Sequence, residues 1–77
     1  MNILYVLIVC EVGAVESILA ELKSLESVKE VSSLFGSYDI IVKLEAASEE
    51  KLKDIVVSKI RNLKNIRTTV TLSVKDI

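Results

Sequence analysis

The residues best suited to binding a small molecule lie in Gly36–Asp39, a segment between two apolar runs. Gly36 is one of only two glycines in the 77-residue chain, which contains no proline. A glycine can take a positive φ and turn the backbone. Ser37, Tyr38 and Asp39 then present a hydroxyl, a phenol and a carboxylate. The segment is either a plain hairpin or the rim of a small-molecule pocket. Asp39 is the residue that a plain hairpin explains least well, because aspartate is disfavoured in strands.

Thr69 and Thr71 form a second candidate group, because alternate residues of a strand share one face. Threonine is also an ordinary residue of edge strands, so a purely structural interpretation stays open. In the strand order derived below, Asp39 and Thr69 are expected on the same uncovered sheet face, two strand spacings or about 9–10 Å apart. A carboxylate and hydroxyls across that gap could clamp a small zwitterion by its ammonium and carboxylate groups.

Catalytic chemistry has few candidates in this composition. The chain has no histidine, so the commonest general base and metal ligand are both missing. Cys10 is the only cysteine, and at the end of an apolar run it is predicted to be a small buried hydrophobe. Glu49 and Glu50 are adjacent, and neighbouring helical side chains diverge by about 100°. We therefore expect no enzyme, no cofactor and no metal.

Charge and hydropathy argue against a DNA-binding protein and against a membrane-spanning or exported one. Ten basic and eleven acidic residues give a formal net charge of −1. The nearest approach to a basic cluster, Lys59–Arg67, lies at a predicted helix end, where the dipole favours cations. Direct DNA binding is therefore not expected. The apolar segment Met1–Cys10 is shorter than the ~20 residues that span a bilayer and has no basic leader, so a cytoplasmic protein is predicted.

Four strands are expected around these residues. Asn2–Cys10 is apolar at both its odd-numbered and its even-numbered positions, as in a central strand buried on both faces. Val28–Phe35 and Tyr38–Glu45 flank the Gly36 turn, and Ile66–Val74 is the last strand. In that last strand, one face is expected to carry Ile66, Val70, Leu72 and Val74, and the other Arg67, Thr69, Thr71 and Ser73.

Two helices are expected between the strands. The first follows Gly13, and the second begins at Ser48, a good N-cap residue before two glutamates. Their apolar stripes are predicted to be Val15, Ile18, Leu19, Leu22 and Leu25, and Leu52, Ile55, Val56, Ile60 and Leu63.

The order of these elements describes a duplicated βαβ unit. Lys23–Lys29 and Arg61–Arg67 match in character position by position, each being a helix end, a polar turn and a strand start. Residues 1–77 are predicted to form one ferredoxin-like α+β domain, with two helices on one face of an antiparallel sheet ordered 4-1-3-2. The composition is 51% apolar, so the other sheet face would expose a large apolar patch. We expect a homodimer that covers it.

Three segments resemble those of a known family. Leu34–Lys43 is similar to a hairpin pattern G-x-[YF]-D-[IL]-[IVL]-[VLK], Ile60–Arg67 to a turn I-x-x-[LI]-[PK]-x-[IV], and Thr69–Thr71 to a T-x-T strand. In this order and spacing, the whole chain resembles the effector-sensing domain of the Lrp/AsnC family. That domain is also called RAM, for regulation of amino-acid metabolism.

The resemblance implies a regulatory domain that dimerises through its open sheet face and assembles further into octameric rings. A free amino acid is implied as effector, bound between dimers by Gly36, Ser37, Tyr38, Asp39, Thr69 and Thr71. Gly36 would allow close backbone approach, Asp39 would meet the ammonium or fix the loop, and the threonines would donate hydrogen bonds. Ser37 is small and neutral where the family is often acidic or polar, which leaves the effector's side chain open.

Full-length members of the family carry an N-terminal helix-turn-helix domain, whereas this sequence starts at the first strand of the sensor. A stand-alone sensor is therefore expected, which could modulate full-length regulators by mixed assembly. Three alternatives stay open. An ACT-type module would bind amino acids at the loop after the first strand, here Glu11–Gly13. The others are a ligand-free assembly module and a small dimeric ferredoxin-like enzyme.

Overall fold

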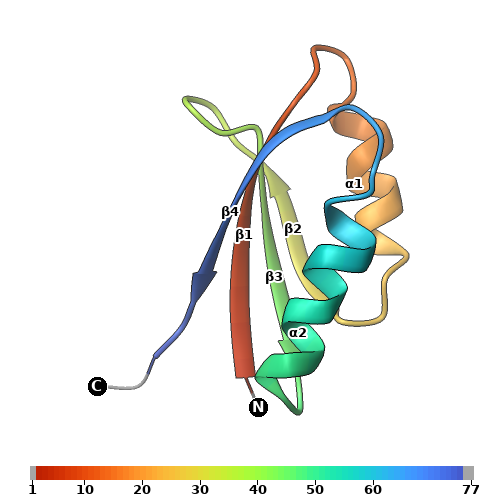
Figure 1. The fold of residues 1–77 in the computed structure, drawn as a ribbon. Helices are drawn as coiled ribbons and strands as arrows, with labels where there is room; N and C mark the ends of the chain where they lie inside the picture. Colours follow the sequence, from red (N-terminus) through yellow and green to blue (C-terminus); the bar gives the residue numbers. More distant parts are fainter. Residues whose placement is uncertain (1, 76–77) are drawn as a thin grey trace.

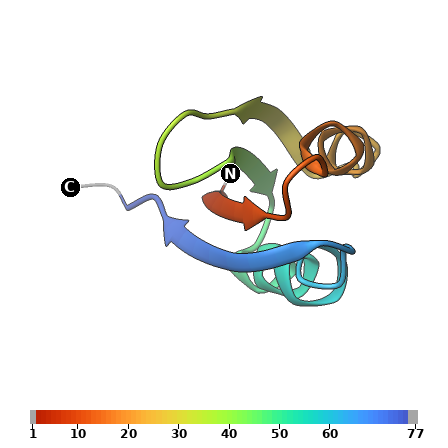
Figure 2. The same cartoon turned by 90° about the horizontal axis from the view of Figure 1, so that it is seen from above.

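The computed structural model describes residues 2–75 and follows the predicted order of strands and helices. The elements are β1 (Asn2–Cys10), α1 (Val15–Lys23), β2 (Val28–Ser33), β3 (Ile40–Ala46), α2 (Glu49–Ile55), the π-helix η1 (Val56–Ile60) and β4 (Ile66–Ser73). The strands pair antiparallel in the order β2-β3-β1-β4. Both helices cover one face of the sheet (Figures 1 and 2). The ferredoxin-like fold and the strand order are confirmed.

The core lies between the helices and the sheet. Even-numbered residues of β1 and β3 face the helices and are buried, apart from the exposed Asn2, whereas odd-numbered residues are half-buried on the open face. The larger fully buried side chains are Leu4, Ile8, Leu22, Ile40, Leu44, Leu52 and Ile60. β1 is therefore a central strand, as its continuous apolar run predicted.

The second helix begins as predicted and ends in a wider turn. The Ser48 hydroxyl accepts a hydrogen bond from the Lys51 amide at 3.1 Å, which confirms the N-cap. In η1, the Arg61 amide donates to the Val56 carbonyl, five residues earlier, at 2.9 Å. The buried residues Leu52, Val56 and Ile60 follow one another at intervals of four residues. In a regular helix, Ile60 would therefore lie about 80° around the helix axis from Leu52 and would turn away from the core. A π turn holds more residues per turn, so it returns Ile60 to the core. None of the helices within residues 2–75 is long and apolar enough to cross a membrane.

The connection between β2 and β3 is longer than predicted. β2 ends at Ser33 and β3 begins at Ile40, so Phe35 and Tyr38 belong to a six-residue loop, Leu34–Asp39, rather than to strands. The Leu34 amide donates to the Asp39 carbonyl at 2.8 Å and closes this loop. Gly36 lies near its middle with φ 115°, which confirms the predicted positive φ.

A β-bulge at the start of β4 overturns the predicted faces of that strand. Ile66 pairs with Cys10, whereas Thr68 pairs with Val9, so Arg67 is one extra residue on β4. One extra residue moves every later side chain to the opposite face of the sheet. The sequence had suggested that Ile66 shares a face with Val70 and Leu72. In the structure they lie on opposite faces, so that prediction is wrong.

After the bulge, the threonines of β4 face the helix side. Thr69 lies opposite Ile8 and Thr71 opposite Val6, and both partners are fully buried beneath the helices. Residues directly opposed in an antiparallel pair project from the same face. The prediction that Thr69 lies on the open face is therefore wrong.

Candidate functional site

The Leu34–Asp39 loop lies at the end of the sheet where β1 also ends and β4 begins. It is the yellow-green loop at the upper left of Figure 1, and Figure 2 shows it bowing away from both helices. Its tip therefore projects on the open-face side of the sheet. Phe35, beside Gly36 at this tip, is fully exposed. A fully exposed aromatic side chain at a loop tip is available for contact with another molecule.

Asp39 is held by three hydrogen bonds that connect the loop to two strands. Its Oδ2 accepts from the Cys10 amide at 2.9 Å, its own amide donates to the Ile8 carbonyl at 2.8 Å, and its carbonyl accepts from Leu34. Regular β1–β3 pairing ends at Ile8 and Ile40. The Cys10 amide then takes a carboxylate oxygen in place of a strand carbonyl. This accounts for an aspartate at a position that strands disfavour: it ends the ladder and fixes the loop.

Cys10 is buried, which confirms the prediction of a small buried hydrophobe. Burial raises the pKa of the Cys10 thiol from its ordinary value of 9.0. The Asp39 carboxylate, through its charge and a hydrogen bond, and the nearby Glu11 charge raise the pKa further. The thiol is therefore protonated at neutral pH and is not a nucleophile.

The loop after β1, which an ACT-type module would use, is tied to the turn before β4. The Glu11 amide donates to the Asn65 carbonyl at 2.8 Å, and Glu11 Oε1 lies 3.7 Å from Arg67 Nε. Gly13 turns the loop with φ 84°, and Val12 is fully exposed. The carboxylate of this loop thus already has a cationic neighbour.

The structure does not bring all six candidate residues together within one chain. Gly36–Asp39 joins β2 and β3, whereas Thr69 and Thr71 lie on β4 at the other edge of the sheet, with β1 between β3 and β4. The threonines face the helix side, whereas the loop projects on the open side. The clamp predicted across the open face of a single chain is therefore wrong, because the bulge at Arg67 turns the threonines over.

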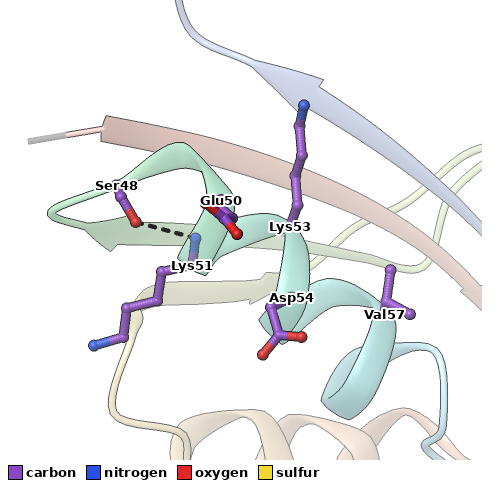
Figure 3. A pocket seen from close by; sticks show the side chains of 6 residues that line it. All are labelled: Ser48, Glu50, Lys51, Lys53, Asp54 and Val57. Atoms are coloured by element: carbon purple, nitrogen blue, oxygen red, sulfur yellow. Dashed lines mark hydrogen bonds between the residues drawn. The ribbon is translucent and has the colours of Figure 1, made fainter.

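A surface depression of 570 Å³ follows α2 and contains none of these candidates. It is lined by Ser48, Glu50, Lys51, Lys53, Asp54 and Val57. All six residues are exposed, and Figure 3 shows the Lys51, Lys53 and Asp54 side chains pointing in different directions. A small-molecule site requires polar groups that converge on one point. This depression has none and is a solvated helix face. Within residues 2–75, no group of three His, Cys, Asp or Glu side chains could hold a metal ion.

Residues 3–76 match the family model described as the Lrp/AsnC ligand binding domain. The chain belongs to the Lrp/AsnC family. The crystal structure of FFRP-DM1 superposes on this Lrp/AsnC domain with a TM-score of 0.93 at 29% sequence identity, covering 97% of this chain and 100% of that one. The family resemblance drawn from the hairpin, turn and T-x-T segments is confirmed.

Two curated relatives carry similar segments. A homocitrate synthase of Saccharolobus islandicus is 40% identical over 55 residues, which are 71% of this chain and 12% of that enzyme. An uncharacterised helix-turn-helix-type transcriptional regulator of Pyrococcus furiosus is 35% identical over 52 residues, 68% of this chain and 35% of the regulator. The Lrp/AsnC domain thus spans a minor part of each of these relatives. The family comprises ligand-binding regulatory domains that are typically non-enzymatic, which disfavours the small-enzyme alternative.

Proposed function

We propose that this Lrp/AsnC domain is an amino-acid-sensing, oligomeric regulatory module whose effector site is completed between chains. The observation that carries the proposal is the separation of its two candidate groups. Gly36–Asp39 joins the edge strand β2 to the inner strand β3, whereas Thr69–Thr71 lie on the opposite edge strand, β4, and the two groups are on different sides of the sheet. This separation supports a site in which a small ligand takes the two groups from two chains.

The loop would supply backbone groups, held in place by Asp39. A Cβ built at Gly36 meets nothing within 4 Å, so the backbone is open to an approaching ligand there. The exposed Ser37 hydroxyl and the neighbouring amides can donate to a carboxylate. Tyr38 is half-buried and would flank the ligand. The Asp39 carboxylate already accepts from the Cys10 amide, which supports its role as the residue that fixes the loop.

The hydroxyls of Thr69 and Thr71, from a second chain, would complete the site. Thr69 is half-buried and Thr71 exposed, and Lrp/AsnC domains are described as ligand-binding. An α-amino acid matches this chemistry, because its carboxylate takes donors and its ammonium takes carbonyl or hydroxyl oxygens.

The open sheet face would hold the chains together. Its half-buried or exposed apolar side chains are Ile3, Tyr5, Leu7, Val9, Ile41, Val70 and Leu72. A continuous apolar face of this kind favours association. We propose a homodimer through this face, higher assembly up to an octameric ring, and mixed assembly with helix-turn-helix regulators in the cytoplasm.

The direct test is a thermal-shift screen of the twenty amino acids, with sedimentation of the same samples. An oligomer stabilised by at least one amino acid is expected, by about 2.7 kcal/mol at a hundredfold excess over the dissociation constant. Thr69→Val should abolish the response. Thr68→Val, one residue away on the opposite face, is the matched control and should retain it. A monomer without any response would refute the proposal, and an oligomer without response would support the ligand-free assembly module.

Mixing two defective variants tests the two-chain site. Ser37→Arg should block the loop and Thr69→Val should remove the hydroxyl, so neither alone should respond. Random assembly of equal amounts restores about a quarter of the composite sites, because one chain supplies each half. No recovery in the mixture would show that each site is built from one chain.

A further inference from the structure

The β-bulge in β4 separates apolar residues that a regular strand would keep together. Ile66, Val70 and Leu72 are an even number of residues apart, so a strand without a bulge would place them on one face. In the structure, Ile66 packs against the core opposite the buried Cys10, whereas Val70 and Leu72 lie on the open face. Arg67 is the one extra residue that lies between them.

The start of β4 is fixed by the turn before it. Asn65 has φ 70°, a left-handed conformation that asparagine tolerates better than most residues. Its carbonyl accepts a hydrogen bond from the Glu11 amide at 2.8 Å. Ile66 follows directly and is half-buried against the core. Turning Ile66 to the open face would break both contacts, so the strand does not remove its bulge in this way.

The remainder of β4 is fixed by the open face. Val70 lies opposite Leu7 and Leu72 opposite Tyr5, and both partners on β1 are half-buried. Sliding these later residues by one position would also remove the bulge, but it would place the threonines of β4 on the open face instead. Covering that face then buries hydroxyl groups in an apolar surface, which is unfavourable unless they find hydrogen-bond partners.

The bulged strand keeps its hydroxyl groups accessible. Thr69 lies opposite Ile8 and Thr71 opposite Val6, and both of these β1 residues are fully buried beneath the helices. Thr69 is nevertheless only half-buried, and Thr71 is exposed. The helices therefore cover β1 but leave the helix side of the edge strand β4 open to a ligand.

We infer that Ile66, Val70 and Leu72 are the positioning residues that turn Thr69 and Thr71 toward the proposed effector. Since the core and the open face require these apolar residues on opposite faces, β4 must accommodate one extra residue. The threonines then lie on the helix side. The inference rests on the proposed function and adds the residues that set the direction of the hydroxyl groups.

The side chain of the extra residue has a minor part in this arrangement. Arg67 Nε lies 3.7 Å from Glu11 Oε1, but the two side chains are 64% and 54% exposed. Exposed ion pairs of this kind contribute little to stability. The bulge therefore follows from the number of residues between the apolar contacts rather than from the charge of Arg67.

Deleting Arg67 is the first test. Ile66 then still pairs with Cys10, and Thr68 still follows opposite Val9, so the bulge disappears and no later residue moves. The oligomer and the response to a thermal-shift screen of the twenty amino acids should survive, with dissociation constants within about threefold of the wild type.

The matched control has the same length and composition as the deletion variant. It combines deletion of Arg67 with exchange of neighbouring residues, T69V/V70T/T71L/L72T. The apolar side chains of β4 then face the helix side and the hydroxyl groups the open face. The oligomer should weaken at least about tenfold because its apolar contacts are lost, and no amino acid should raise Tm.

The same exchange without the deletion tests the register if the shortened chains fail to fold. The apolar residues at positions 66, 69 and 71 then suit a regular strand, so the bulge should disappear. Position 71 should lie opposite Tyr5, whereas Thr71 of the wild type lies opposite Val6. Nuclear Overhauser contacts between the backbones of β1 and β4 identify the opposed residues without any effector.

Two results would overturn the inference. One is loss of the fold, or of a response present in the wild type, on deletion of Arg67. The other is a bulge that persists in the exchanged chain of full length. A wild-type chain that responds to no amino acid would instead refute the proposed function, and the backbone contacts would still decide whether the apolar residues set the register.

Discussion

Replacing Asp39 with alanine removes the carboxylate that accepts the Cys10 amide at the end of β1. The bond is 2.9 Å long and partly buried. A hydrogen bond to a charged group contributes about 1.5–3 kcal/mol, and an unpaired buried amide costs a similar amount. We expect the free energy of unfolding to fall by about 2 kcal/mol. In a domain of this size such a loss lowers Tm by roughly 8–16 °C.

Urea unfolding and hydrogen exchange measure this loss together. Exchange at the Cys10 amide should accelerate in Asp39→Ala, because its acceptor is gone. Ser37→Ala, in the same loop but exposed, is the control and should change stability by less than about 0.5 kcal/mol. Unchanged unfolding and unchanged Cys10 protection in Asp39→Ala would refute the role assigned to this carboxylate.

Asp39→Asn separates the two roles that an aspartate can have in the effector site. The amide oxygen of asparagine can still accept from Cys10, so loop geometry and effector binding should largely survive. If the carboxylate instead pairs with the effector's ammonium, Asp39→Asn should lose binding as completely as Asp39→Ala. Calorimetric titration of the effector found in the thermal screen distinguishes these results.

Two further predictions concern the π-helix and the thiol. Deleting the exposed Val57 should convert η1 into a regular helix that still buries Ile60, with unfolding free energy changed by about 1 kcal/mol or less. Deleting the exposed Ala20 from the regular helix α1 is the control and should cost several kcal/mol, because it moves the buried Leu22 off the core face. The raised pKa of Cys10 means that the folded chain retains a proton that the unfolded chain releases. The contribution of the Cys10 thiol to the free energy of unfolding should therefore be fully present below about pH 9 and be lost as pH rises from there through the folded-state pKa. In Cys10→Ala, the free energy of unfolding measured in urea should change less with pH over that range.

The fold could be predicted from the sequence because its signals are local and periodic. The run Asn2–Cys10, which is apolar on both faces, indicated the central strand. Apolar residues at helical spacing indicated both helices. The strand ends at the hairpin could not be predicted in the same way. They depend on the bond between Asp39 and Cys10, which are 29 residues apart. Non-local hydrogen bonds of this kind leave no periodic trace in the sequence.

The bulge at Arg67 shows why the candidate site was harder to predict than the fold. Both registers of β4 keep the same alternation of threonine with valine and leucine, so the pattern alone cannot say which set faces the helices. Some bulges are marked by glycine, but here the extra residue is an arginine whose Nε lies 3.7 Å from Glu11. In the register without the bulge, Thr69 and the hairpin side of the sheet could form a site within one chain. With the bulge, the threonines face the helix side whereas the loop projects on the open side, and the proposed two-chain site rests on this difference.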